Sequence, residues 1–96
     1  MLIIDKGITI GEVVTIKLTS GEEILGRLVE DTDKYVKIGR PLVLTATEQG
    51  IGMVPYLFTV DPKKDVKINK PISVLEPTEA AAAKQYIQST TTIAMI

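Results

Sequence analysis

Apolar and polar residues alternate along two stretches near the start of the chain. The first is Val13–Leu18 and the second is Glu23–Glu30, and each has the period-two pattern of a strand with one buried face. Ser20-Gly21-Glu22 separates them and has the composition of a tight hairpin turn. Gly26 lies inside the second stretch, where a glycine is typical of a sharp bend or a close approach between backbones. The pattern therefore predicts a β-hairpin whose second strand is bent.

A third strand is predicted after a short polar connection. Tyr35–Ile38 and Leu42–Thr47 both have strand character, and Gly39-Arg40-Pro41 separates them. Because proline has no N–H to donate to a sheet, Pro41 predicts an edge or a bulge at this point. We therefore expect the third strand to be interrupted between its two halves.

Two further strands complete the predicted sheet. Met53–Val60 follows a turn at Glu48–Gly52 and predicts a fourth strand. Asp61–Asp65 is a strong turn, and Val66–Val74 predicts a fifth strand that is disturbed at Pro71. These segments together predict an all-β fold, a small and strongly bent barrel of about five strands.

The predicted fourth strand is apolar on both of its faces. Val54, Tyr56 and Phe58 share one face, and Met53 and Leu57 share the other. A sheet exposed to water on one side normally carries polar residues there. A second apolar face occurs in the hairpin as well, and it is formed by Leu25 and Val29. Excess apolar surface of this kind indicates contact with a partner.

The two ends of the chain are expected to form different structures. Leu2–Ile4 and Ile8–Ile10 are β-branched pieces that predict either a small hairpin or one kinked lead-in to the first strand. We therefore assign residues 1–76 to the barrel, including this lead-in. Residues 77–96 are assigned to a C-terminal helix and a frayed tail.

A short helix is predicted near the C-terminus. Thr78 can cap its first turn, and Glu79 complements the positive end of the helix before a run of alanines. Tyr86 and Ile87 offer apolar side chains with which the helix can dock on the barrel. We expect the helix to end within Ser89–Thr92, and a helix this short needs packing partners to be stable.

Length and charge limit the possible functions. The chain has 96 residues, enough for one domain, and its 11 basic and 12 acidic residues give a net charge of −1. Nucleic-acid binding would therefore need a local basic patch. No apolar run is long enough to span a bilayer, and the apolar start at Met1–Ile4 is too short for a signal peptide. We expect a cytoplasmic protein with no membrane partner.

Catalysis and metal binding are not expected. The chain has no cysteine and no histidine, which removes thiolate ligands and the commonest general base. Ser20 has no base at a recognisable spacing, and Glu22-Glu23 fall on a predicted turn. Glu30, Asp31 and Asp33 have no metal-loop spacing, so solvated acids are favoured over a divalent cation site. We expect no enzymatic activity and no cofactor.

The hairpin and its polar connection carry a resemblance to a known family. An alternating apolar strand ending in Leu-x-x-Gly, followed by Gly-x-Leu and Asp-x-aromatic, resembles the first signature motif of the Sm-like family. The chain is similar to Sm-like proteins of cyanophage origin in its acidic composition and alanine-rich C-terminal segment. The matching residues are Val14, Ile16, Leu18, Gly21, Ile24, Gly26, Leu28, Asp33 and Tyr35.

The resemblance implies an SH3-like barrel, a ring of copies and a site for single-stranded RNA at the pore. Asp33 and Tyr35 match the Asp-x-aromatic element, in which the aromatic ring stacks on a base. Lys37 stands where the family has the asparagine that reads the base edge. No Arg-Gly pair marks the second family motif. The nearest candidates for its basic residue are Lys63 and Lys64, or Asn69 and Lys70 in an alternative register.

Two functions remain open from the sequence. The first is a homo-oligomeric ring that binds single-stranded RNA near the pore through Tyr35, Lys37, Lys63, Lys64 and Asp33. The second is a structural or adaptor ring that binds another protein, of phage or host, without nucleic acid. For Tyr35 the simpler interpretation is that its ring packs against a neighbour, and for the lysine pair it is a solvated turn. If the protein comes from a phage, the compartment is the cytoplasm of the host cell.

Overall fold

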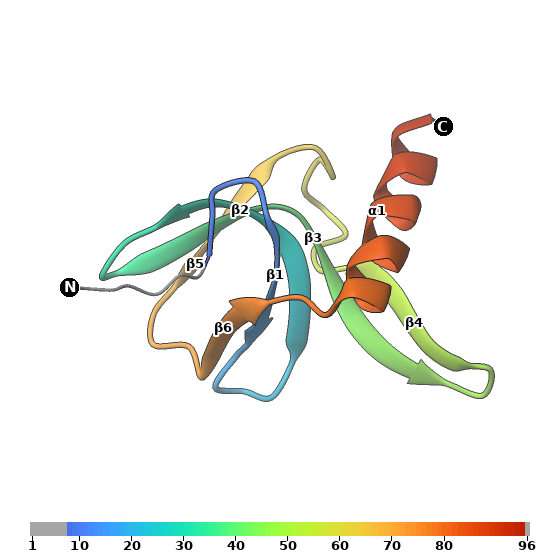
Figure 1. Cartoon of the computed structure of the whole chain (residues 1–96), viewed down its shortest axis with the longest axis horizontal. Helices are drawn as coiled ribbons and strands as arrows, with labels where there is room; N and C mark the ends of the chain where they lie inside the picture. Colours follow the sequence, from blue (N-terminus) through green and yellow to red (C-terminus); the bar gives the residue numbers. More distant parts are fainter. Residues whose placement is uncertain (1–7, 96) are drawn as a thin grey trace.

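Residues 8–95 form a curved antiparallel sheet of six strands with one C-terminal helix (Figure 1). The structure is a computed structural model, which describes residues 8–95 and the side chains of residues 8–91. The strands follow the order β4-β3-β2-β1-β6, and β5 pairs with β3 as well. The elements are β1 (Val13–Lys17), β2 (Glu23–Asp31), β3 (Tyr35–Thr47), β4 (Gly50–Pro55), β5 (Asp65–Asn69), β6 (Val74–Pro77) and α1 (Ala80–Met95).

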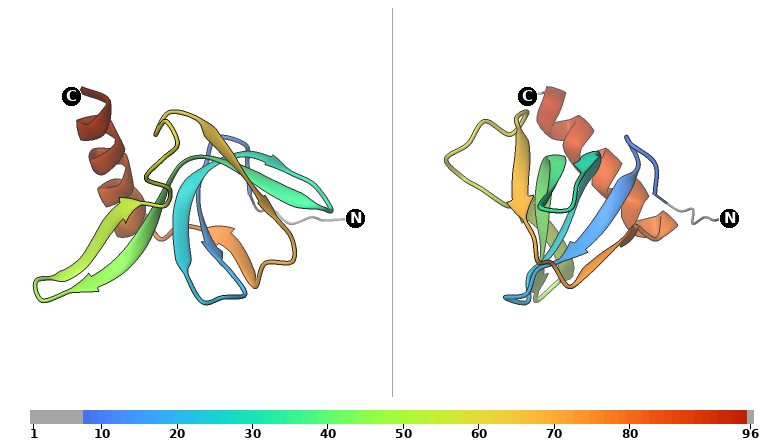
Figure 2. Two further views of the ribbon diagram at one scale, coloured as in Figure 1. Left: turned by 180° about the vertical axis from the view of Figure 1, so that it is seen from behind. Right: turned by 90° about the vertical axis from the view of Figure 1, so that its left-hand side faces the viewer.

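The third strand connects two parts of the molecule. The first half of β3 pairs with β5 and belongs to a small, strongly bent barrel that also contains β1, β2 and β6. Its second half pairs with β4, and this hairpin extends away from the barrel as an arm (Figures 1 and 2). The predicted all-β, strongly bent barrel-like fold with a C-terminal helix is confirmed.

The bend in β3 arises where it crosses β2. Between the pairs Leu25↔Leu42 and Arg27↔Gly39, β3 contains one more residue than β2, which is a β-bulge opposite Gly26. A Cβ atom on Gly26 would lie 3.0 Å from the Cδ1 atom of Ile38 and 3.2 Å from the Gly39 carbonyl oxygen, so a side chain here would need its neighbours to move. The predictions of a close approach at Gly26 and a bulge at Pro41 are therefore confirmed.

The strand limits after the bend differ from those predicted. Gly39-Arg40-Pro41 does not interrupt the third strand, since β3 runs continuously from Tyr35 to Thr47. The chain instead turns sharply inside this strand, where Arg40 adopts φ 50°. The predicted strand Met53–Val60 is wrong in its bounds, since β4 starts at Gly50 and ends at Pro55. Its partner strand bends away at Pro41, so residues 56–64 leave the sheet as a loop and pairing resumes in β5.

The predicted fifth strand is two strands. Val66–Val74 is divided by a turn that contains the cis peptide Lys70-Pro71, with β5 before it and β6 after it. β5 pairs with β3, whereas β6 pairs with β1 on the opposite side of the barrel. A proline without an N–H to donate is placed where the chain changes partners.

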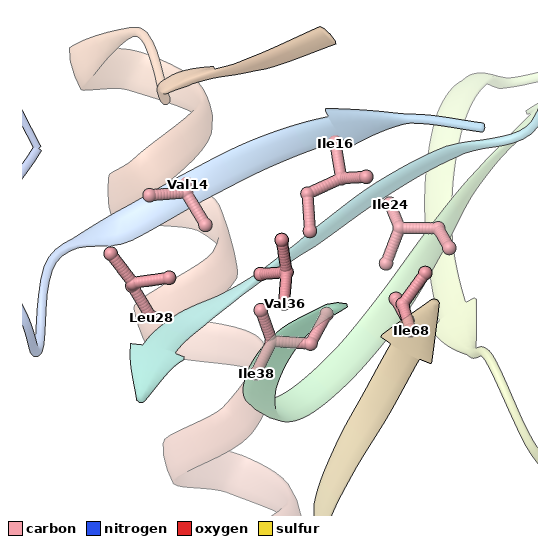
Figure 3. Close-up of a cluster of buried hydrophobic side chains, with 7 residues drawn as sticks. All are labelled: Val14, Ile16, Ile24, Leu28, Val36, Ile38 and Ile68. Atoms are coloured by element: carbon pink, nitrogen blue, oxygen red, sulfur yellow. The ribbon is translucent and has the colours of Figure 1, made fainter. Parts of the chain in front are cut away.

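An aliphatic cluster fills the barrel (Figure 3). Its side chains come from the inward positions of β1, β2, β3 and β5, as the alternation predicts. Burying such side chains is the main favourable term in folding, at about 1.5–3 kcal/mol for each fully buried side chain. The cluster consists of Val14, Ile16, Ile24, Leu28, Val36, Ile38 and Ile68.

The helix covers the outer side of the bent sheet. Tyr86 is 1% exposed and packs with Val13, Leu25 and Leu42 in a second cluster. The Tyr86 hydroxyl oxygen lies 3.0 Å from the Gly39 carbonyl oxygen and 2.9 Å from that of Arg40, so it is positioned to donate at the bend. The prediction that Leu25 meets a partner is therefore wrong, because α1 of the same chain buries it.

The ends of the helix also differ from prediction. Glu79, and not Thr78, caps α1, since its carboxylate accepts the N–H groups of Ala81 and Ala82. These backbone hydrogen bonds lower the pKa of Glu79. The helix continues beyond Ser89–Thr92 to Met95. The hydroxyl of Thr90 donates to the Tyr86 carbonyl one turn earlier in the helix. This bond occupies a hydroxyl that could otherwise compete for backbone groups, so the β-branched Thr90 remains helical.

The N-terminal lead-in is only partly described. Leu2–Ile4 lies outside the described residues. Ile8–Ile10 forms no strand, and the chain instead turns at Ile10-Gly11, with Gly11 at φ 93°. The Gly11 N–H donates to the Leu28 carbonyl at 2.8 Å, which fixes the entry into β1.

Alkaline pH is expected to destabilise the fold through Tyr86. Burial raises the pKa of its hydroxyl to about 12, and the nearby Arg27 opposes this effect only in part. Because the unfolded hydroxyl ionises near pH 10, the contribution of Tyr86 to stability should be complete below that pH and lost as pH rises towards about 12. Urea midpoints measured across this range test the expectation. The urea midpoint should fall less steeply with pH in Tyr86→Phe. An equal fall in both proteins would show that Tyr86 does not cause this pH dependence.

Candidate functional site

Polar and aromatic side chains gather on the outer face of β3 and β5. Val36, Ile38 and Ile68 point into the core, so the alternate positions of these paired strands face outwards. Asn69 is directly opposite Tyr35, and Lys67 is directly opposite Lys37. We call these four outward residues, Tyr35, Lys37, Lys67 and Asn69, the Tyr35 face.

Tyr35 is held by two neighbours. Its hydroxyl donates to Glu30 Oε1 at 3.1 Å, and the Lys67 ammonium lies 4.5 Å from the centre of its ring. The hydrogen bond to Glu30 is the main cause that raises the pKa of Tyr35. Lys37 Nζ lies 3.8 Å from the same Glu30 oxygen. Tyr35 thus combines an aromatic surface with adjoining cations, although one side of the ring is in contact with Lys67.

The turn between β2 and β3 adjoins the Tyr35 face. Asp33 and Lys34 are exposed at its tip, and the Thr32 N–H closes it by donating to the Tyr35 carbonyl. Lys70 links this turn to the connection after β5, because its N–H donates to the Lys34 carbonyl and its ammonium contacts Asp31 at 2.9 Å. The Tyr35 face, Asp33, Lys34 and Lys70 therefore lie at one end of the barrel.

The structure separates the two halves of the predicted binding site. Asp33, Tyr35 and Lys37 lie together, whereas Lys63 and Lys64 precede β5, beyond the position where Asp65 pairs with Gly39. Four residues of strand, roughly 13 Å, separate that position from Tyr35. The lysine pair instead lines a pocket beside Arg40. The alternative register, with Asn69 and Lys70, places those residues beside Tyr35.

Sequence reasoning missed Lys67. The signal was available, because Val66 and Ile68 are apolar strand positions and Lys67 between them must face the other way. What the pattern did not specify was the partner of this strand. Only the register of β5 against β3 places Lys67 beside Lys37 and over the ring of Tyr35.

Two of the acidic residues near this end take part in ion pairs. Glu30 contacts Lys37 and Tyr35, and Asp31 contacts Lys70. Within residues 8–95, no three carboxylates come close enough to hold a metal ion. In the same part of the chain, no helix combines the length and the apolar character needed to cross a bilayer.

No protein-family model matches the chain, and no curated protein sequence matches it.

Proposed function

We propose that the chain forms an Sm-like homo-oligomeric ring in the cytoplasm and binds single-stranded RNA at the Tyr35 face. The observation that supports this function is the convergence of an aromatic ring, an amide and several lysines from distant segments of the sequence. Proteins commonly bind single strands by stacking bases on aromatic rings and by placing lysines against phosphates. In the complex, Tyr35 stacks a base, Asn69 reads a base edge, and Lys37 and Lys67 contact phosphates.

The ring is proposed from strands that have a free edge. Within residues 8–95, β4 pairs with β3 alone and β6 pairs with β1 alone, so each has an edge that this part of the chain leaves unpaired. Ile51 is 62% exposed on β4, and Val54 and Val74 are also exposed on these two strands. Pairing β4 of one copy with β6 of the next satisfies both edges and closes a ring when the rotation allows.

Sedimentation and native mass spectrometry test the ring. We expect a single species whose mass is a multiple of the 10.4 kDa chain. The double variant Ile51→Lys and Val54→Lys places charges on the exposed β4 edge and should reduce the mass to that of one chain, with an unchanged circular dichroism spectrum. A well-folded single chain in dilute unmodified protein would contradict the ring.

Fluorescence anisotropy with labelled oligo(U) and oligo(A) at low and high salt tests RNA binding. Tyr35→Ala is expected to weaken binding by about 5- to 150-fold, since stacking on an aromatic residue contributes about 1–3 kcal/mol per base. Tyr35→Phe keeps the stacking surface and removes only the hydrogen bond to Glu30, so it should bind nearly as well as the unmodified chain. Binding that ignores salt and persists in Tyr35→Ala would refute RNA binding at this face.

A second candidate function is an adaptor ring that binds another protein without nucleic acid. Exposed apolar side chains in the 56–64 loop favour it, because Phe58 is 82% exposed and Leu57 and Val60 are also exposed. Partners captured from lysate should then survive nuclease treatment. If all of them disappear with nuclease, this candidate fails.

A further inference from the structure

A pocket lies where the arm, the 56–64 loop and the helix meet. Its wall is apolar and is formed by Pro41 and Leu42 of β3, Pro55 of β4, Leu57 and Val60 of the loop, and Val66 of β5. Asp61 is its one carboxylate, and the rest of its lining consists of Arg40, Pro62, Lys63, Lys64 and Thr90. We call it the Arg40 pocket. The loop that borders it projects from the barrel in Figure 2.

A second depression adjoins the first and continues its positive charge. The two share Arg40, Lys63 and Thr90, and the second adds Arg27 and Asp65. The pair of depressions is thus lined by four cationic side chains and two carboxylates. Within the described part of the chain, none of the four cations forms an ion pair. The combined surface is therefore complementary to an anion.

Arg40 has a backbone conformation that glycine or asparagine adopts more easily. Its φ of 50° lies in the left-handed region, where a residue with a Cβ is less stable than glycine. One guanidinium nitrogen lies 3.3 Å from the Thr90 carbonyl oxygen, which orients the side chain along the border of both depressions. An arginine at a position that favours glycine indicates that its side chain is used.

The chemistry of the pocket favours an acidic peptide over a nucleotide. Its apolar wall suits an aliphatic or aromatic side chain, whereas a nucleobase there would bury polar edges against proline and leucine without partners. No aromatic ring lines the described pocket, so base stacking is not provided. Carboxylates beside the inserted side chain would meet Arg40, Lys63 and Lys64.

We propose that the Arg40 pocket binds an acidic peptide segment of a partner protein, with one apolar side chain inserted and its neighbouring carboxylates paired with Arg40, Lys63 and Lys64. The proposal rests on the second candidate function and supplies the chemistry of its partner. It assigns to Lys63 and Lys64 a role separate from the Tyr35 face.

Fluorescence anisotropy with a labelled peptide that carries two aspartates on each side of one leucine tests the proposal. Saturable, salt-sensitive binding is expected, and the same peptide with lysines in place of aspartates should not bind. Arg40→Gly should weaken binding about tenfold or more, as expected for loss of a charged hydrogen-bond donor, without lowering the melting temperature. A merely structural role for Arg40 would lower that temperature and leave the affinity unchanged.

Two further variants test the pocket without changing Arg40, which lies at the bend of β3. Lys63 and Lys64 are both exposed, so the double variant Lys63→Glu and Lys64→Glu should fold and lose the peptide. Lys84→Glu changes an exposed lysine of α1 outside the pocket and should bind normally. Binding of the lysine peptide, full affinity in the double variant, or displacement of the peptide by oligo(U) would overturn the proposal.

The outcomes also distinguish this proposal from the proposed functions. Tyr35→Ala should leave peptide affinity unchanged whether or not it abolishes RNA binding. If the peptide fails to bind while protein partners survive nuclease treatment, the adaptor function stands and the pocket assignment is wrong.

Discussion

Tyr86→Ala is expected to lower the free energy of unfolding by about 3–5 kcal/mol, the range for truncating a large buried aromatic residue. The ring is 1% exposed and joins the helix to Val13, Leu25 and Leu42. Its removal leaves a cavity in this cluster and two carbonyls at the β3 bend without their donor. For a domain of this size, each kcal/mol corresponds to about 4–8 °C in melting temperature. Thermal unfolding followed by circular dichroism measures the effect.

Tyr86→Phe separates the hydroxyl from the ring. It keeps the apolar contacts but removes the donor that the Gly39 and Arg40 carbonyls share, so a loss of about 1–3 kcal/mol is expected. Tyr56→Phe is the matched control, because Tyr56 is half-buried and its hydroxyl forms no hydrogen bond within residues 8–91. If both phenylalanine variants melt at the same temperature, the hydroxyl of Tyr86 does not stabilise the bend.

Gly26→Ala is expected to lower the free energy of unfolding by about 1–3 kcal/mol through overpacking. The added Cβ would lie 3.0 Å and 3.1 Å from side-chain atoms of Ile38 and 3.2 Å from the Gly39 carbonyl oxygen. Ile38 is fully buried in the barrel cluster, so its side chain has little room to move. Urea unfolding gives the difference in stability.

Gly52→Ala provides the control for this substitution. Gly52 is a strand glycine too, but its nearest neighbours would be a methyl group of Thr47 at 3.7 Å and one of Thr45 at 3.9 Å, which are ordinary contacts. Alanine there should be neutral or stabilising by about 0.4–1 kcal/mol, because it restricts the unfolded chain. Equal losses in the two alanine variants would show that the β2–β3 crossing has room for a methyl group.

The first hairpin could be predicted because its information is local. Alternation placed Val14 and Ile16 in the core, and a glycine inside a strand indicated the close approach at Gly26. The alternation of Met53–Val60 gave the wrong strand limits, because the end of β4 depends on where its partner β3 bends. That bend has Arg40 in the left-handed region and receives a donor from Tyr86, 46 residues away along the chain.

The candidate site was predictable in the same partial way. Asp33, Tyr35 and Lys37 are close in sequence and stay close in space. Lys67 and Lys70 join them only through strand pairing and the turn after β5, whereas Lys63 and Lys64 belong to another surface. The apolar face at Leu25 looked unpartnered because the sequence does not state which surface α1 covers.

The pairing of β1 with β6 has a consequence for protein synthesis. Thr15 of β1 contacts Thr78, which follows β6 and lies 63 positions later in the chain. The edge of β1 therefore stays open on the ribosome until almost the whole barrel has emerged. Glu79 caps the helix that covers Leu25 immediately afterwards. The late segment from β6 to α1 therefore completes both hydrophobic clusters, because Leu75 packs against one and Tyr86 belongs to the other. A stalled nascent chain lacking this segment would display an open strand and bare aliphatic side chains, which are the features that chaperones bind and that promote aggregation.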